Sequence, residues 1–272
     1  MHYSYQGTTL GSQVQSNIEI LDFRSKILER DLRFYIYSPN LLLPLQSHHL
    51  LYMHDGQNLF SAKTAYRGSH WGLKETLDQL ISMHYIPPLT VVGIGSDANR
   101  FSDYAALRDP DFRGGAGGGG GRFEESVISE ICPAVERRLK FEARLGSRAV
   151  GGASLGALSS LSLGGRFPGY FTKFMLMSPS LFWANAHWLS QPLDMFNGTR
   201  LWLDVGDKEE SFPGCAALAV KNFHFFSARL KKLAPAAAVK QMIGVGHKHD
   251  EIAWGSRAAR ALKFLYPEDQ KT

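Results

Sequence analysis

The chain has 272 residues, of which 44% are hydrophobic and 20% are charged, as is ordinary for a globular protein that buries a full core. Its formal net charge is +5, but basic residues are interspersed with acidic ones along the chain, so the charge pattern does not indicate nucleic-acid binding. No apolar run approaches the roughly 18 residues that a membrane-spanning helix needs.

The cysteine content and the first residues of the chain indicate the cellular compartment of the protein. Cys132 and Cys215 are too few for a disulfide framework, and no Cys/His spacing indicates a zinc site. Residues 1–6 lack the basic and apolar regions of an export signal. If Met1 is the natural start, we expect a cytoplasmic protein. The length of the chain favours a single domain over residues 1–272.

The first predicted elements are strands of two kinds. Residues 18–23 and 33–37 alternate apolar and polar side chains, which predicts a pair of antiparallel strands. Residues 49–53 are nearly all apolar, as is typical of a strand buried on both faces. The pattern then predicts a helix over 71–83 and a second buried strand over 89–94.

In the rest of the chain, helices and strands are predicted in alternation. A long amphipathic helix is predicted over 123–139, and a strand at 148–151 leads to a helix over 155–163. We expect Gly164-Gly165 and Pro168 to end that helix. The alternation predicts an α/β fold, with a mostly parallel central sheet and helices on both faces. Three further strands are predicted at 173–177, 200–205 and 239–244, with helices after the second and third.

A glycine-rich stretch over 113–122 interrupts this alternation. It does not match a phosphate-binding P-loop, because Arg122-Phe123 stands where Lys and Ser or Thr are required. We therefore expect a mobile loop, placed where it could border a substrate site.

The stretch Gly152-Ala153-Ser154-Leu155-Gly156 fits the G-x-S-x-G pattern of a nucleophile elbow. A serine displayed on a sharp turn between strand and helix needs small neighbours, because larger side chains would collide there. Ser154 lies at the predicted end of a strand and start of a helix. A plain turn with a capping serine would satisfy the same pattern. An acid and a histidine later in the chain would favour the nucleophile elbow over a plain turn.

In α/β hydrolases the nucleophile is followed in the chain by an acid and then by a histidine. The loop after the strand at 200–205 offers Asp207, Glu209 and Glu210 as acids. The loop after the last strand offers His247 and His249. The residues alone leave these alternatives open.

Several segments together resemble a known family. They are residues 51–60, Arg100 with Asp103-Tyr104, 151–156, 178–183, 206–209, and His249-Asp250-Glu251 with Trp254. With these segments, nearly the whole chain resembles the putative esterase family of α/β hydrolases. That family is related to esterase D and includes feruloyl esterases, enterochelin esterases, S-formylglutathione hydrolases and mycolyl transferases.

The resemblance implies roles for individual residues. It selects Glu209 as the acid, with Asp207 in reserve, and His249 over His247. Two positions depart from the family pattern, since Ala157 replaces a glycine after the elbow and Glu209 stands where Asp is common. By resemblance and predicted position, the pocket walls would include Trp71, Arg100, Tyr104 and Trp183.

The function that follows is a serine esterase, which cleaves carboxylic esters through an acyl-enzyme on Ser154. The backbone N–H groups of Leu155 and Gln57 would form the oxyanion hole. This chemistry needs no cofactor or metal, and the expected partner is a small-molecule ester. Two alternatives remain: an acyltransferase that uses the same triad, and a catalytically silent binding protein with the same fold.

Overall fold

The computed structural model describes residues 17–39, 49–142, 144, 146–210 and 214–267, and eight strands among them form one sheet. All the strands predicted from the sequence are present. They are β1 (Asn17–Ser25), β2 (Arg30–Ser38), β3 (His49–His54), β4 (Leu89–Ile94), β5 (Arg148–Ala153), β6 (Lys173–Met177), β7 (Arg200–Gly206) and β8 (Ala238–Gly244). Residues 1–6, on which the expectation about an export signal rests, lie outside the described residues.

The strand order across the sheet is β1-β2-β4-β3-β5-β6-β7-β8. β1 pairs with β2, and β2 with β4, in antiparallel register, as the alternating pattern of the first two strands predicted. The pairs from β4 through β8 are parallel. Their carboxyl ends therefore meet at one edge of the sheet, where the connecting loops are brought together.

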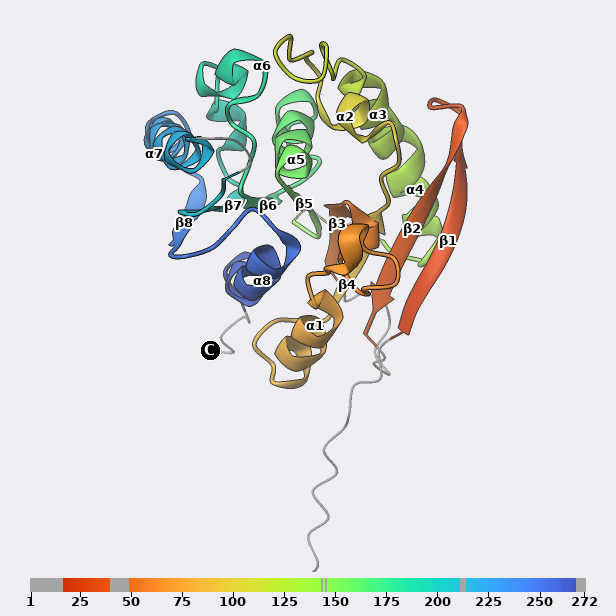
Figure 1. The fold of residues 1–272 in the computed structure, drawn as a ribbon. Coiled ribbons are helices and arrows are strands. Elements are labelled where there is room, and N and C mark those ends of the chain that lie inside the picture. The colour runs from red at the N-terminus through yellow and green to blue at the C-terminus, as the bar shows by residue number, and fades with distance from the viewer. Residues whose placement is uncertain (1–16, 40–48, 143, 145, 211–213, 268–272) are drawn as a thin grey trace, which may run out of the picture.

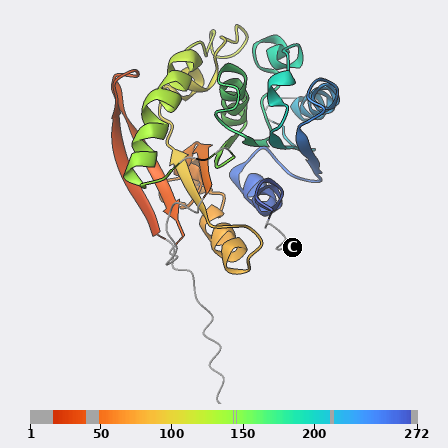
Figure 2. The same ribbon diagram turned by 180° about the vertical axis from the view of Figure 1, so that it is seen from behind.

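Helices cover both faces of the sheet (Figure 1). α1 and α8 lie on one face, while α3, α4, α5 and α7 lie on the other, and the view from behind shows the same division (Figure 2). The α-helices are α1 (Leu73–Ser82), α2 (Arg100–Tyr104), α3 (Gly120–Ser126), α4 (Cys132–Arg138), α5 (Leu155–Arg166), α6 (Trp183–Ala186), α7 (Cys215–Leu233) and α8 (Glu251–Leu265). Short 3-10 turns occur at η2 (Gly56–Asn58), η3 (Tyr66–Gly68), η5 (His187–Leu189) and η6 (Asp194–Phe196), and a π-helical turn, η4 (Val127–Ile131), joins α3 to α4.

The sheet separates two clusters of buried apolar side chains. In β3, Leu50 and Tyr52 belong to the cluster under α3, α5 and α7, while Leu51 and Met53 belong to the cluster under α1 and α8. Because side chains alternate between the faces of a strand, a strand covered on both faces must be apolar throughout. This is why the run at 49–53 is nearly all apolar.

Two glycine segments depart from the sequence expectations. α5 continues through Gly164-Gly165 to Arg166, where a stop was predicted. The predicted loop at 113–122 is shorter, because α3 begins at Gly120. A Cβ on Gly120 would lie 2.6 Å from the backbone N of Ala106, and a Cβ on Gly117 would lie 2.5 Å from Leu107 O. Glycine therefore lets this segment pack closely against residues 105–108.

Candidate active site

Ser154 occupies the sharp turn between β5 and α5. Its backbone angles, φ 57° and ψ −121°, are rare for a residue with a side chain and cost free energy that the surrounding structure must supply. The flanking glycines explain how the turn closes. A Cβ on Gly152 would lie 2.8 Å from the backbone carbon of Gly156, and a Cβ on Gly156 would lie 2.9 Å from Cβ of His54. The local geometry is that of a nucleophile elbow.

The Ser154 hydroxyl lies beside a second serine hydroxyl. Its Oγ is 3.1 Å from Oγ of Ser180, which follows β6. The Ser180 N–H also donates to Ser154 O at 3.3 Å. Ser154 and His249 line the same cavity, so the imidazole and the serine face one space.

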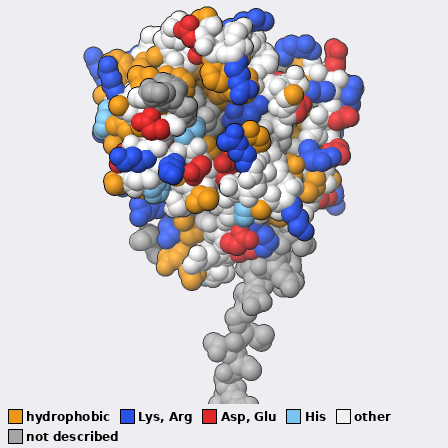
Figure 3. Space-filling model, in the orientation of Figure 1, with side chains coloured by type: hydrophobic (Ala, Val, Ile, Leu, Met, Phe, Trp, Pro, Cys, Tyr) orange, Lys and Arg blue, Asp and Glu red, His pale blue; other side chains and the backbone are white. Residues whose placement is uncertain are grey.

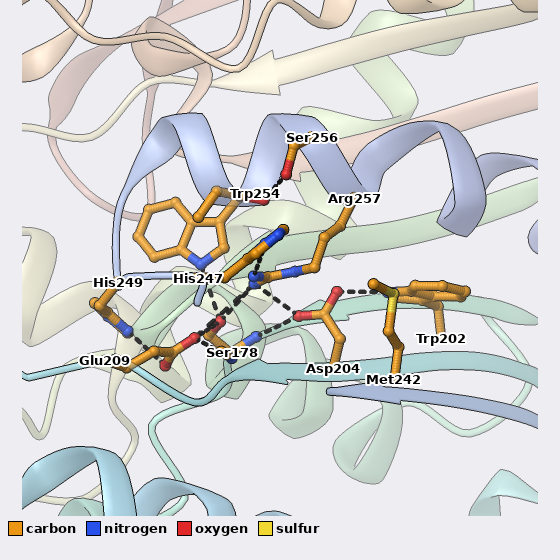
Figure 4. A network of polar contacts seen from close by, with 12 residues as sticks. Ser178, Trp202, Asp204, Glu209, Met242, His247, His249, Trp254, Ser256 and Arg257 are labelled. Carbon is orange, nitrogen blue, oxygen red and sulfur yellow. Dashed lines mark hydrogen bonds and ion pairs between the residues drawn. The ribbon is translucent and has the colours of Figure 1, made fainter. Parts of the chain in front are cut away.

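Glu209 and His249 come together from the loops after β7 and β8 (Figure 4). Oε2 of Glu209 lies 2.9 Å from Nδ1 of His249. The other oxygen of Glu209, Oε1, accepts from the Gly206 N–H at 2.6 Å and from the Ser178 hydroxyl. Glu209 is only 2% exposed, so these hydrogen bonds compensate the loss of water around its carboxylate.

The reserve acid Asp207 and the alternative histidine His247 make different contacts. Oδ1 of Asp207 accepts from the Gly246 N–H at 2.6 Å and so ties the loop after β7 to the loop after β8. Nδ1 of His247 lies 3.1 Å from Nη1 of Arg257. The geometry thus pairs Glu209 with His249, and it gives Asp207 and His247 other contacts.

His249 is also held by the start of α8. Asp250 caps this helix, since its side chain accepts from the Ala253 N–H at 2.9 Å. The His249 ring packs edge-on against Trp254, with centroids 5.0 Å apart and planes at 84°. The helix therefore fixes the ring whose Nδ1 faces Glu209.

The loop after β3 lies on the other side of Ser154. Asp55 has a left-handed backbone (φ 56°), and η2 follows it. A Cβ on Gly56 would lie 2.4 Å from the backbone carbon of Gly93, so only glycine allows this approach. The Gln57 side chain is held by Ser96, through bonds of 2.8 and 3.0 Å. The N–H groups of Leu155 and Gln57 belong to the first turns of α5 and η2, where helix geometry provides no acceptor.

Arg100 anchors this loop. Its Nε and Nη2 bond the two oxygens of Asp55 at 2.8 and 2.7 Å. Burial alone would raise the pKa of Asp55, but the Arg100 guanidinium holds it below its ordinary value. Asp55 therefore carries a charge that Arg100 compensates, and the forked pair fixes the loop that presents Gln57.

A cavity of about 800 Å³ opens over Ser154. Of the four pocket residues expected from the sequence, Arg100 lies in its wall. Tyr104 and Trp183 line a smaller cavity of about 50 Å³, and Trp71 is buried with its ring 6.0 Å from that of Trp254. The lining of the large cavity comprises Asp55, Gln57, Asn58, Thr64, Tyr66, Ser96, Asp97, Ala98, Arg100, Phe101, Arg113, Ser154, His249, Glu251 and Trp254.

Several of these lining residues, Tyr66 and Phe101 among them, were not expected from the sequence. Tyr66 in η3 and Phe101 in α2 come from short elements without a hydrophobic period, whereas Arg113 stands at the start of the glycine-rich stretch that was expected to border a substrate site. Arg113 lies over the ring of Phe101, with Cζ 4.6 Å from the ring centroid. Glu251 was noted only as part of a family segment. Burial raises its pKa, and it accepts from Nδ2 of Asn58 at 3.1 Å.

A further histidine, His54, ends β3 beneath the elbow. It is 2% exposed and packs between Tyr104 and Phe123, and neither ring nitrogen has a hydrogen-bond partner among the described residues. Burial lowers its pKa to about 4, so the ring is neutral near pH 7. It acts as a packing residue. Within the described ranges, no three His, Cys, Asp or Glu side chains are grouped as a metal ion would require.

The sheet order and the elbow define the class of the protein: it has the α/β-hydrolase fold. The model of the family described as "Putative esterase" matches residues 25–265. The chain belongs to this family, whose name is that of esterases.

Three individual proteins that this chain resembles are each 27% identical to it or less. The uncharacterized protein YbbA of Bacillus subtilis is 27% identical over 167 residues, which cover 58% of this chain and 61% of that protein. The BES protein from Bacillus cereus is similar in structure, with a TM-score of 0.72, 18% identity and coverage of 98% of this chain and 99% of that chain. The enterobactin esterase of Shigella flexneri gives a TM-score of 0.70 and 19% identity, over 92% of this chain and 59% of that chain. At these identities the structural likeness shows the fold.

The surface and helices add two observations. Lys and Arg side chains are interspersed with Asp and Glu over the face seen in Figure 3. In the described part of the chain, no helix combines the length and apolar character needed to cross a membrane.

Proposed function

We propose that this protein is a serine esterase that cleaves carboxylic esters through an acyl-enzyme on Ser154. One observation carries the proposal: the strained elbow places Ser154 in the cavity that His249 also lines, and His249 is hydrogen-bonded to the buried Glu209. A nucleophile, a base and a group that orients the base therefore meet at one edge of the sheet.

The first half of the reaction forms the acyl-enzyme. When an ester binds, the Ser154 hydroxyl turns from Ser180 to Nε2 of His249, which takes its proton as Oγ attacks the carbonyl carbon. The negative charge that develops on the carbonyl oxygen is stabilised by the N–H groups of Leu155 and Gln57. The intermediate collapses, the C–O bond to the alcohol breaks, and Nε2 returns the proton to the leaving alcohol.

The second half repeats these steps with water. His249 takes a proton from water as the oxygen attacks the acyl carbon, and the collapse returns that proton to Ser154 Oγ and releases the acid. Glu209 stays ionised throughout, fixes the proton on Nδ1 and stabilises the imidazolium.

The partner in this proposal is a small-molecule ester, which the cavity of about 800 Å³ can accommodate. Arg100 and the aromatic residues Phe101 and Trp254 form part of its wall. A cytoplasmic location stays a prediction from the sequence.

The test is the hydrolysis of p-nitrophenyl acetate by the wild-type protein and by Ser154→Ala. We expect Ser154→Ala to lower kcat by roughly 10³-fold or more while the fold is retained, because alanine lacks the hydroxyl that forms the acyl-enzyme. Ser227→Ala is the matched control, since Ser227 is a buried serine on α7 that does not line the cavity. Ester hydrolysis by Ser154→Ala at the wild-type rate would overturn the proposal.

A further inference from the structure

Ser178 lies at the centre of a buried network beneath Glu209 (Figure 4). It follows β6 and is 2% exposed. Its hydroxyl donates to Oε1 of Glu209, which is the oxygen that does not face His249. Two groups from α8 reach the same hydroxyl: Nε1 of Trp254 at 3.0 Å and Nη2 of Arg257 at 2.9 Å.

Hydrogen-bond capacity fixes the direction of these bonds. A serine hydroxyl has one hydrogen to donate and two lone pairs that accept. The indole N–H of Trp254 and the guanidinium of Arg257 can only donate, so together they occupy both lone pairs of Ser178 Oγ. The hydroxyl hydrogen is left for Glu209. Trp254 and Arg257 on α8 therefore orient, through Ser178, the carboxylate carried by the loop after β7.

The backbone of Ser178 is strained in a way that fits this role. Its φ is 45°, a left-handed conformation that residues with a side chain rarely adopt. The Ser178 N–H is held by Asp204, at 3.0 Å from the backbone oxygen and 3.2 Å from Oδ1. Glycine would suit this backbone better, so the serine is explained by its hydroxyl and not by the turn.

Asp204 also controls how the charge of Arg257 is shared. Arg257 and Asp204 are both fully buried, and Nη2 of Arg257 lies 3.0 Å from Oδ1 of Asp204 but 3.9 Å from Oε1 of Glu209. Arg257 therefore compensates Asp204 more closely than Glu209. Much of the negative charge of Glu209 is thus left to stabilise the imidazolium of His249.

We propose that Ser178 is a positioning residue, which acts on His249 through Glu209. It anchors Oε1 so that Oε2 stays aimed at Nδ1 of His249, while the ion pair with Asp204 keeps Arg257 from neutralising Glu209. This proposal rests on the proposed serine esterase function.

The test is a double-mutant cycle measured as kcat for p-nitrophenyl acetate. We expect Ser178→Ala to lower kcat by about 10-fold or more with little change in KM, because Glu209 loses the donor that orients it. In the Glu209→Gln background the same change should lower kcat by less than about 2-fold, since the group it acts through is already disabled. A loss of equal size in both backgrounds would overturn the proposal, as would an unchanged kcat in Ser178→Ala.

Ser178→Gly separates positioning from folding. Glycine suits φ 45° and lacks the hydroxyl, so this variant should fold at least as well as Ser178→Ala, judged by its thermal midpoint, and lose kcat to the same extent. If Ser178→Gly has a higher thermal midpoint than Ser178→Ala and also a kcat close to that of the wild-type protein, the loss in Ser178→Ala comes from folding and the positioning role is wrong. Ser126→Ala is the matched control, because Ser126 is fully buried and its Oγ donates only to Phe123 O, at 2.7 Å.

The variant Ser154→Ala, measured in the same assay, tests the proposed function independently of Ser178. A kcat that survives Ser154→Ala overturns the acyl-enzyme mechanism and the positioning role with it. A kcat that is lost in Ser154→Ala but unchanged in Ser178→Ala overturns only the positioning role.

Discussion

Glu209 and Asp207 lie two residues apart after β7, yet their carboxylates have different contacts. Glu209 is buried, and its Oε2 faces His249 at 2.9 Å. Asp207 points to the neighbouring loop and accepts from the Gly246 N–H. The extra methylene of Glu209, a departure from the family pattern, still lets its carboxylate reach the imidazole.

Exchanging each carboxylate for its amide tests this assignment. We expect Glu209→Gln to lower kcat for p-nitrophenyl acetate by roughly 10³-fold or more, because an amide cannot stabilise the imidazolium of His249. Asp207→Asn should change kcat by less than about 10-fold, since its amide oxygen can still accept from Gly246. If Asp207→Asn shows the larger loss, the acid has been assigned wrongly.

Among individual residues, the sequence could predict those that belong to a recognisable motif. Ser154 stands in a motif whose glycines are required by close contacts, and the family resemblance selected Glu209 and then His249 from the acids and histidines that follow it in the chain. Arg257 could not be predicted in the same way, because nothing along the chain shows that an arginine on α8 will meet Asp204 from β7. That pairing depends on how the helix packs against the sheet.

Helices and strands were predicted correctly where the hydrophobic residues recur with a clear period. β4 has the predicted limits of 89–94, and the helix predicted at 123–139 is present as α3, η4 and α4. The main error at this scale is the end of α5, which runs through Gly164-Gly165 although these glycines predict a stop. Glycine is a poor helix former, but here a packing requirement overrides propensity.

Alanine in place of Gly164 and in place of Gly165, near the end of α5, should have opposite effects on stability. A Cβ on Gly164 would lie 2.6 Å from Cε1 of Phe196 and 2.7 Å from Cε1 of Phe174, both buried rings. Gly164→Ala should therefore destabilise the fold by about 1–3 kcal/mol through overpacking. A Cβ on Gly165 would lie 3.4 Å from its nearest neighbour, an ordinary contact, so Gly165→Ala should stabilise the helix by up to about 1 kcal/mol.

Urea unfolding of the two variants beside the wild-type protein measures both changes. Gly165→Ala serves as the matched control, because it makes the same substitution one position away on the same helix. Equal effects at the two positions would show that helix propensity, and not the contact with Phe174 and Phe196, decides at Gly164.

For the whole molecule, the parallel part of the sheet explains why the site lies where it does. The loops after β3, β5, β7 and β8 leave the same edge, and they carry Gln57, Ser154, Glu209 and His249. The α/β class and its mostly parallel sheet could be predicted from the alternation of elements. Much of the cavity wall could not, because Tyr66 in η3 and Phe101 in α2 lie in short elements without a hydrophobic period, although Arg100 and the glycine-rich stretch that begins at Arg113 were expected near the site.

The central claim is that Ser154 is the nucleophile of a serine esterase, and the most direct measurement is the position of a covalent adduct. The folded protein would be treated with a fluorophosphonate, which reacts with activated serines, and the adduct located by peptide mass spectrometry. We predict a single adduct on Ser154, absent after denaturation because the unfolded chain has no base beside the serine. An adduct on another residue, such as Ser180 beside it, or no adduct on protein that hydrolyses esters, would contradict the account.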